Sequence, residues 1–162
     1  MLLVADVGNT ETTIGLFDGD ALHAQWRLTT DVPRTPDEFA LVIRALLDAK
    51  GVSPGRIHGC AIGSVVPGIT AILGDACAAV SGAAVRTIDG TSRLPIRLDV
   101  EEPQTVGADR ILNTLAASRV FKRDCIVVDL GTATTFDCIT ADGVFIGGVI
   151  APGLQTSAET LF

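Results

Sequence analysis

A repeated motif constrains the fold of this chain more than any other feature of its sequence. Residues 3–8 read LVADVG and residues 127–131 read VVDLG, so each copy ends a β-type run on an aspartate and a glycine. A threonine-rich turn follows each copy, and each turn leads into a run that ends near an Asp-Gly pair. Asp6 and Asp129 lie 123 residues apart. The same order of strand, acid, glycine and threonine turn, found twice, indicates an internal duplication.

Apolar spacing and turn residues predict an α/β order of elements. The Asp18-Gly19 pair predicts a hairpin within three antiparallel opening strands. Thr35 as a cap and Pro36 at the first helical position predict a helix that ends before Gly51. We expect strands at 2–7, 12–17, 22–28, 57–65, 84–88, 96–98, 125–130, 135–140 and 144–150. We expect the other helices at 67–80 and 108–120, with a further one from Leu154 onward.

Composition and charge exclude several classes of protein. Lysine and arginine total 12 against 19 acids, for a net charge of −7, which disfavours nucleic acid and anionic membranes as partners. No apolar run reaches the ~18 residues of a membrane span, and the N-terminus lacks a basic leader, so we expect a cytoplasmic protein. Wide spacing favours reduced, buried thiols over a zinc or disulfide set at Cys60, Cys77, Cys125 and Cys138. His23 and His58 have no ligand-like neighbours.

The two Asp-x-Gly-x-Thr turns have a chemistry suited to phosphate. Glycine permits a turn whose backbone amides point at an anion, and threonine adds hydroxyl donors. An aspartate at the strand tip can hold Mg²⁺ directly or through water. A single copy is also explained by an ordinary turn in which the side chains satisfy the backbone. Two copies favour phosphate binding, and neither lysine, Lys50 nor Lys122, lies in a P-loop motif.

Gly107-Ala108-Asp109-Arg110 opens the predicted helix before the second copy. Asp109 could act only on the helix dipole, and Arg110 could be only a surface charge. Alternatively, an aspartate near a transferring phosphoryl group can orient a hydroxyl and accept its proton. An arginine beside it can bind a carboxylate or phosphate through its planar fork.

Together these motifs resemble the type III pantothenate kinase family, within the superfamily of acetate and sugar kinases, heat-shock chaperones and actin. The resemblance rests on residues 6–10, 107–110, 129–135 and 147–153 and covers the chain in order. It implies an α/β fold of duplicated ribonuclease-H-like (actin-like ATPase) lobes, with mixed sheets flanked by helices. The lobes are expected at 1–122 and 123–162, the second one incomplete.

The resemblance implies ATP-dependent phosphorylation of the pantothenate hydroxyl, the first step of coenzyme A biosynthesis. It makes Asp109 the catalytic proton acceptor, and it implies Mg²⁺ with ATP, a monovalent cation (K⁺ or NH₄⁺) at Asp129, and a homodimer. Asp6 would also help to hold Mg²⁺. The implied ATP-binding residues are Asp6, Val7, Gly8, Asn9, Thr10, Glu11, Thr12, Thr13 and Thr132. The implied pantothenate-binding residues are Gly107, Ala108, Asp109 and Arg110, with Arg110 meeting the carboxylate.

Two departures from the family pattern leave alternatives open. Val100 stands where many members have an aromatic wall of the substrate pocket, and only 33 residues follow Asp129. We therefore expect a kinase fragment with an uncovered sheet face rich in Val127, Ile146, Val149 and Ile150. The alternatives are a non-catalytic nucleotide-binding or regulatory accessory protein of the family, and a small-molecule or sugar kinase of the superfamily.

Overall fold

The computed structural model describes residues 1–160 and divides the chain into two compact units. The first unit spans Met1–Ile88 and the second begins at Asp89. Packing thus places the helix that starts at Ala108 in the second unit, whereas the repeat suggests a boundary between residues 122 and 123. The expected lobes at 1–122 and 123–162, which follow the repeat in the sequence, stay a prediction.

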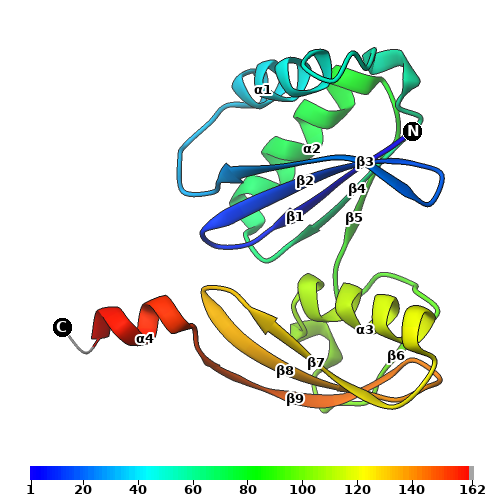
Figure 1. The fold of residues 1–162 in the computed structure, drawn as a ribbon, viewed down its shortest axis with the longest axis vertical. Helices are drawn as coiled ribbons and strands as arrows, with labels where there is room; N and C mark the ends of the chain where they lie inside the picture. Colours follow the sequence, from blue (N-terminus) through cyan, green and yellow to red (C-terminus); the bar gives the residue numbers. More distant parts are fainter. Residues whose placement is uncertain (161–162) are drawn as a thin grey trace. The chain divides into compact units, whose positions relative to one another are not determined.

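A five-stranded mixed sheet in the order β3-β2-β1-β4-β5 forms the centre of the first unit (Figure 1). The three opening strands are antiparallel, while β4 and β5 run parallel to β1. The strands are β1 (Leu2–Val7), β2 (Glu11–Asp18), β3 (Ala21–Thr29), β4 (Gly59–Ser64) and β5 (Val85–Ile88). β4 begins at Gly59, two residues later than predicted, and the His58 amide just before it donates to the Met1 carbonyl.

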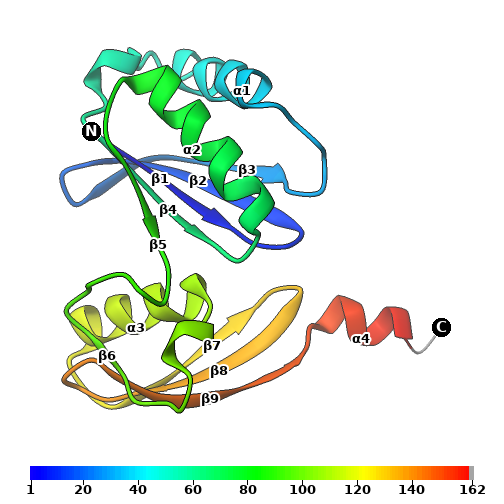
Figure 2. The same ribbon diagram turned by 180° about the vertical axis from the view of Figure 1, so that it is seen from behind.

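Both helices of the first unit cover the same face of this sheet (Figures 1 and 2). They are α1 (Pro36–Asp48) and α2 (Pro67–Ser81), with a short 3-10 turn, η1 (Pro54–Arg56), between them. The predicted cap of α1 is confirmed: Thr35 accepts from the Glu38 amide, and the Glu38 carboxylate accepts from the Thr35 amide. Phe39 and Leu73 are among the core side chains that the helices place against the sheet.

The second unit contains a four-stranded sheet in the order β6-β9-β8-β7. Its strands are β6 (Arg97–Leu98), β7 (Cys125–Leu130), β8 (Ala133–Ile139) and β9 (Val144–Pro152). Its helical elements are η2 (Pro103–Thr105), α3 (Ala108–Phe121) and α4 (Leu154–Thr160). β8 begins at Ala133, two residues before the predicted start, because the second turn is tighter than the first.

The two copies of the motif fold in the same way, which confirms the duplication. β1, β2 and β3 are consecutive antiparallel neighbours, and so are β7, β8 and β9. In the first turn the Gly8 amide donates to the Glu11 carbonyl at 3.0 Å, and in the second the Gly131 amide donates to the Ala133 carbonyl at 3.0 Å. The second turn is one residue shorter, but it likewise places a threonine opposite the aspartate: Thr13 lies opposite Asp6, and Thr135 lies opposite Asp129.

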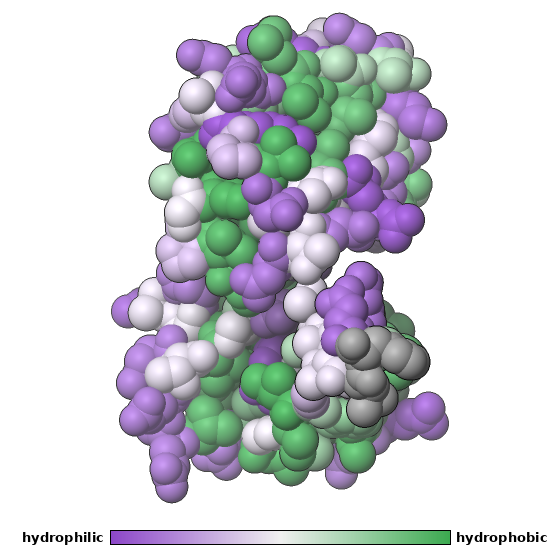
Figure 3. Space-filling view, turned by 90° about the vertical axis from the view of Figure 1, so that its left-hand side faces the viewer, coloured by the Kyte–Doolittle hydropathy of each residue, from purple (hydrophilic) through white to green (hydrophobic). Residues whose placement is uncertain are grey.

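The two copies differ in which of their apolar side chains are covered. Leu3 on β1 is 2% exposed, whereas Ile126, its counterpart on β7, is 63% exposed. Val128, Leu130, Phe136 and Val149 are also exposed, and the strand register places all five on one face, here called the open face. Hydrophobic surface of this unit is visible in the lower part of Figure 3.

The prediction of an uncovered face is thus confirmed, with a correction to its membership. Val127 alternates with Ile126 and Val128 and is half-buried on the opposite face, where it pairs with Asp137. Ile150 is exposed but pairs with Thr135, so it also belongs to the opposite face. The prediction took all apolar residues of these strands together, whereas successive side chains of a strand point to opposite faces of the sheet.

Candidate active site

The first turn connects β1 to β2 within residues 6–13. Asp6 is the last but one residue of β1 and lies opposite Thr13 in the ladder. Asn9 and Thr10 are exposed at the tip. Behind the tip, the buried Thr12 hydroxyl lies 2.8 Å from the Thr30 hydroxyl, and this pair fixes the turn to the end of β3. The turn is therefore anchored from behind while its tip is open to solvent.

The second turn, between β7 and β8, presents Asp129 opposite Thr135 and the exposed Thr132 at its tip. The Thr132 carbonyl accepts from the Gly153 amide at 3.0 Å and from the Thr156 hydroxyl at 3.1 Å. A side chain at Gly153 would collide with the carbonyls of Gly131 and Thr132. Glycine at position 153 is therefore required for the start of α4 to pack against this turn.

The Gly-Ala-Asp-Arg motif forms the start of α3, as predicted. Gly107 caps the helix without a side-chain bond, and its carbonyl accepts from the Ile111 amide at 3.1 Å. Ala108 is 3% exposed and is therefore covered almost completely by its neighbours. Asp109 is half-buried, and its carboxylate accepts from the Arg110 amide at 2.8 Å. This bond holds Asp109 at the N-terminal end of the helix, where the peptide dipoles favour a negative charge.

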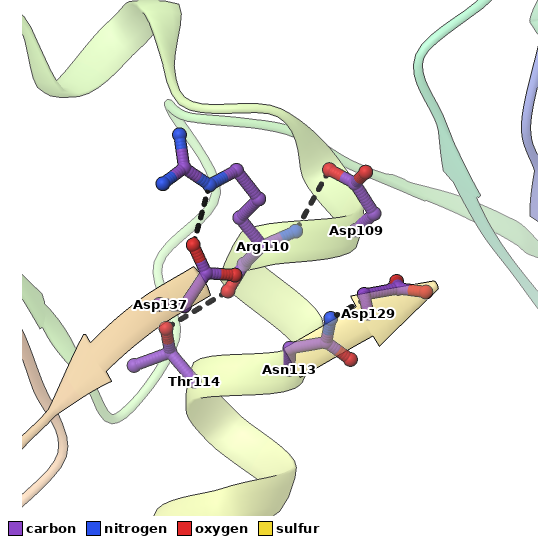
Figure 4. Close-up of polar contacts among 6 residues, drawn as sticks. All are labelled: Asp109, Arg110, Asn113, Thr114, Asp129 and Asp137. Atoms are coloured by element: carbon purple, nitrogen blue, oxygen red, sulfur yellow. Dashed lines mark hydrogen bonds and ion pairs between the residues drawn. The ribbon is translucent and has the colours of Figure 1, made fainter. Parts of the chain in front are cut away.

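Arg110 is bound to an aspartate that the sequence reasoning missed. Its Nε donates to Asp137 Oδ1 at 2.7 Å, with the two side chains 14% and 0% exposed (Figure 4). The guanidinium also lies over the ring of Phe145, with its carbon 5.0 Å from the ring centroid. The pKa of Asp137 is raised because burial disfavours its charge; Arg110 opposes this shift, and the charges of Asp109 and Asp129 reinforce it. Asp109, Arg110, Asp129 and Asp137 therefore form one electrostatic cluster.

Asp137 could have been suspected from one signal. It is the acid within the β8 run Phe136-Asp137-Cys138-Ile139, and a charge in an otherwise apolar strand is rarely buried without a partner. Nothing in the local sequence identifies that partner, which lies 27 residues earlier. The structure thus adds Asp137 and Phe145 to the predicted site residues.

Oxygen ligands for a hard cation are present near the second turn. The exposed Asp129 carboxylate lies 3.4 Å from the Asn113 amide nitrogen, and the Thr135 hydroxyl on the same sheet face is buried without a hydrogen-bond partner. A carboxylate and a hydroxyl are oxygen donors of the kind that a hard cation takes. Within residues 1–160, no group of three or more His, Cys, Asp or Glu is arranged to hold a metal.

The cysteines are thiols, and His58 has a contact at the N-terminus. All four cysteines are free; Cys60 and Cys77 are buried as predicted, while Cys125 and Cys138 are only half-buried. His58 lies 2.6 Å from the N-terminal amine, which is a structural contact. Val100 is half-buried between β6 and η2.

Solved structures with a similar fold define the class of this chain. The Ppx/GppA family member of Aquifex aeolicus matches 99% of the chain and 54% of its own, with a TM-score of 0.55 at 16% identity. The ROK hexokinase of Thermus thermophilus matches 96% of the chain and 50% of its own, with a TM-score of 0.52 at 15% identity. At these identities the likeness concerns the fold alone, which is a mixed α/β fold of the actin-like ATPase type, as predicted.

Sequence comparison then gives the family. The model of the type III pantothenate kinases matches residues 2–162, and the chain belongs to this family. The type III pantothenate kinase of Roseiflexus sp. (strain RS-1) is 44% identical over 162 residues, and that of Syntrophotalea carbinolica is 45% identical. Each match covers 100% of this chain and 64% of the relative, so the chain spans less than two thirds of their length. None of the helices in residues 1–160 has the length and apolar character of a membrane span.

Proposed function

We propose that this chain carries out, or contributes the larger part of, ATP-dependent phosphorylation of the pantothenate hydroxyl to 4'-phosphopantothenate, the first step of coenzyme A biosynthesis. The observation that carries the proposal is the cluster in the second unit. Asp109 and Arg110 on the first turn of α3 and Asp129 on β7 all act on the buried Asp137. The first turn of α3 thus carries both groups that the acceptor needs: the Asp109 carboxylate for its hydroxyl and the Arg110 guanidinium for its carboxylate.

A role in binding the phosphates of ATP is assigned to each of the two turns. The amides of Asn9 and Thr10 and the hydroxyls of Thr10 and Thr13 are assigned as phosphate donors, because the Gly8 amide already donates to the Glu11 carbonyl within the turn. Thr132 is assigned the same role within the second turn. Asp6 is the residue assigned to the Mg²⁺ that accompanies ATP, which neutralises charge on the transferring phosphoryl group. The anchoring of the first turn through Thr12 and Thr30 supports this role, because a preformed turn loses little entropy on binding.

The acceptor end is assigned to the start of α3. Asp109 accepts the proton of the attacking hydroxyl, and its bond to the Arg110 amide leaves one carboxylate oxygen for that purpose. Arg110 receives the pantothenate carboxylate, while Gly107 borders the substrate and the nearly buried Ala108 supports this end of the helix. Asp129, with the Thr135 hydroxyl, holds the monovalent cation. The proposal also includes a homodimer in the cytoplasm that has neither nucleic acid nor membrane as a partner.

The test is phosphate transfer from [γ-³²P]ATP to pantothenate by the full protein that contains this chain. Asp109→Asn keeps the size of the side chain but removes its basicity, and we expect kcat to fall about 10²- to 10⁴-fold. Asp18→Asn, which breaks only an exposed contact 3.6 Å from Arg56, is the matched control and leaves kcat unchanged. Binding of ATP without transfer to any acceptor would favour the accessory-protein alternative, and transfer to a sugar would favour a different kinase.

A further inference from the structure

The side chain of Arg110 is fixed in one orientation by three neighbours. Asp137 takes the Nε–H, Phe145 covers one face of the guanidinium, and β9 lies alongside at Gly148. A side chain at Gly148 would collide with Arg110 Nη2 and approach Asp137 Oδ1 to 2.9 Å. The bare backbone at position 148 therefore leaves the space that the guanidinium occupies.

This arrangement is incomplete as a purely structural ion pair. Arg110 Nη2 and Asp137 Oδ2 are both buried with no hydrogen-bond partner among the described residues. In Figure 4 the guanidinium nitrogens beyond Nε carry no bond to the residues drawn. A buried ion pair stabilises a protein only when its remaining donors and acceptors are also satisfied. Donors left unused on a fixed arginine are more consistent with a ligand-binding role, since a planar guanidinium matches a carboxylate.

We propose that Asp137 is a positioning residue: by holding Arg110 Nε, with Gly148 providing the space, it directs the remaining guanidinium nitrogens to the carboxylate of the acceptor. This inference rests on the proposed function for the identity of the acceptor. It assigns selectivity for a carboxylate-bearing acceptor to a residue that need not touch the acceptor at all. Without Asp137, Arg110 would keep its positive charge, but its guanidinium would no longer be held in one orientation.

The functional test compares two acceptors, pantothenate and the same molecule with its carboxylate reduced to an alcohol. In Asp137→Ala we expect the KM for pantothenate to rise about 10- to 100-fold, the value of one charge-assisted hydrogen bond. We expect kcat, the KM for ATP and the kinetics with the alcohol to change less than about threefold. Asp137→Asn retains an acceptor oxygen for Nε, so its KM should rise less than that of Asp137→Ala. Asp18→Asn is again the control. A loss of stability alone would reduce activity with both acceptors equally and would overturn the proposal.

A second readout separates this inference from the proposed function. In the full protein, the Arg110 Nε–H resonance, assigned by its absence in Arg110→Lys, should exchange slowly with water. It should lose this protection in Asp137→Ala and keep it in Asp18→Asn. If the wild type does not phosphorylate pantothenate but the resonance is protected, the proposed function fails and the positioning of Arg110 by Asp137 stands. An unprotected wild-type resonance overturns the positioning role regardless of activity.

Discussion

The difference in burial between the two copies of the repeat predicts different costs for the same kind of substitution. Leu3 and Ile126 occupy equivalent places, on β1 and β7, but are 2% and 63% exposed. Leu3→Ala removes a fully packed side chain and is expected to cost about 2–5 kcal/mol in the free energy of unfolding. Burying a whole side chain of this kind is worth about 1.5–3 kcal/mol, and only about a third of Ile126 is buried, so Ile126→Ala should cost about 0.5–1 kcal/mol.

Urea unfolding, monitored by hydrogen exchange and mass spectrometry, measures the change in the free energy of unfolding separately for each unit. Trp26, the single tryptophan, packs against the core of the first unit and gives an independent fluorescence signal for Leu3→Ala. Leu22→Ala, at a 52% exposed position of the first unit, is the control and should behave like Ile126→Ala. A cost of about 2 kcal/mol or more for Ile126→Ala would mean that the open face is packed in solution, and it would refute the reasoning from exposure.

Two further predictions concern titrating groups. Thr35→Ala should cost about 1 kcal/mol by urea unfolding at neutral pH. Hydrogen bonds from Thr35 lower the pKa of Glu38. The contribution of Glu38 to the free energy of unfolding is therefore present above the ordinary carboxyl pKa and is lost as pH falls through the lowered value. Burial raises the pKa of Asp137 above its usual 3.8, so its contribution is present below 3.8 and lost as pH rises through the raised value. The stability of the wild type relative to Asp137→Asn should therefore decline from acid to neutral pH; an increase would contradict the direction of the shift.

The sequence predicted those parts of the structure that depend on local pattern. The repeat around Asp6 and Asp129 was sufficient to predict two antiparallel meanders with the same turn, because strand alternation and turn residues act over a few positions. Thr35 and Pro36 likewise predicted the start of α1, since a cap is a local hydrogen-bonding requirement. The placement of Asp109 and Arg110 on the first turn of α3 followed from the same reasoning.

What the sequence could not predict depends on contacts between distant segments. The pairing of Arg110 with Asp137 joins a helix to a strand, and no spacing rule connects them. Gly148 was noticed only as part of a motif, whereas the structure shows that it leaves room for the guanidinium. The early start of β8 follows from a turn one residue shorter than the first, because this changes where pairing begins. The face of Val127 has a separate cause, the alternation of side chains along β7.

The proposed function places pantothenate at the start of α3 and assigns the transfer of its hydroxyl proton to Asp109. The most direct measurement follows ATP and pantothenate by ³¹P NMR in the full protein, with wild type, Asp109→Asn and Asp18→Asn compared in parallel. We expect the wild type and Asp18→Asn to form 4'-phosphopantothenate and ADP in equal amounts. Asp109→Asn should be at least about 100-fold slower. Equal rates for Asp109→Asn and the wild type, or ADP formed without a phosphorylated acceptor, would contradict the claim.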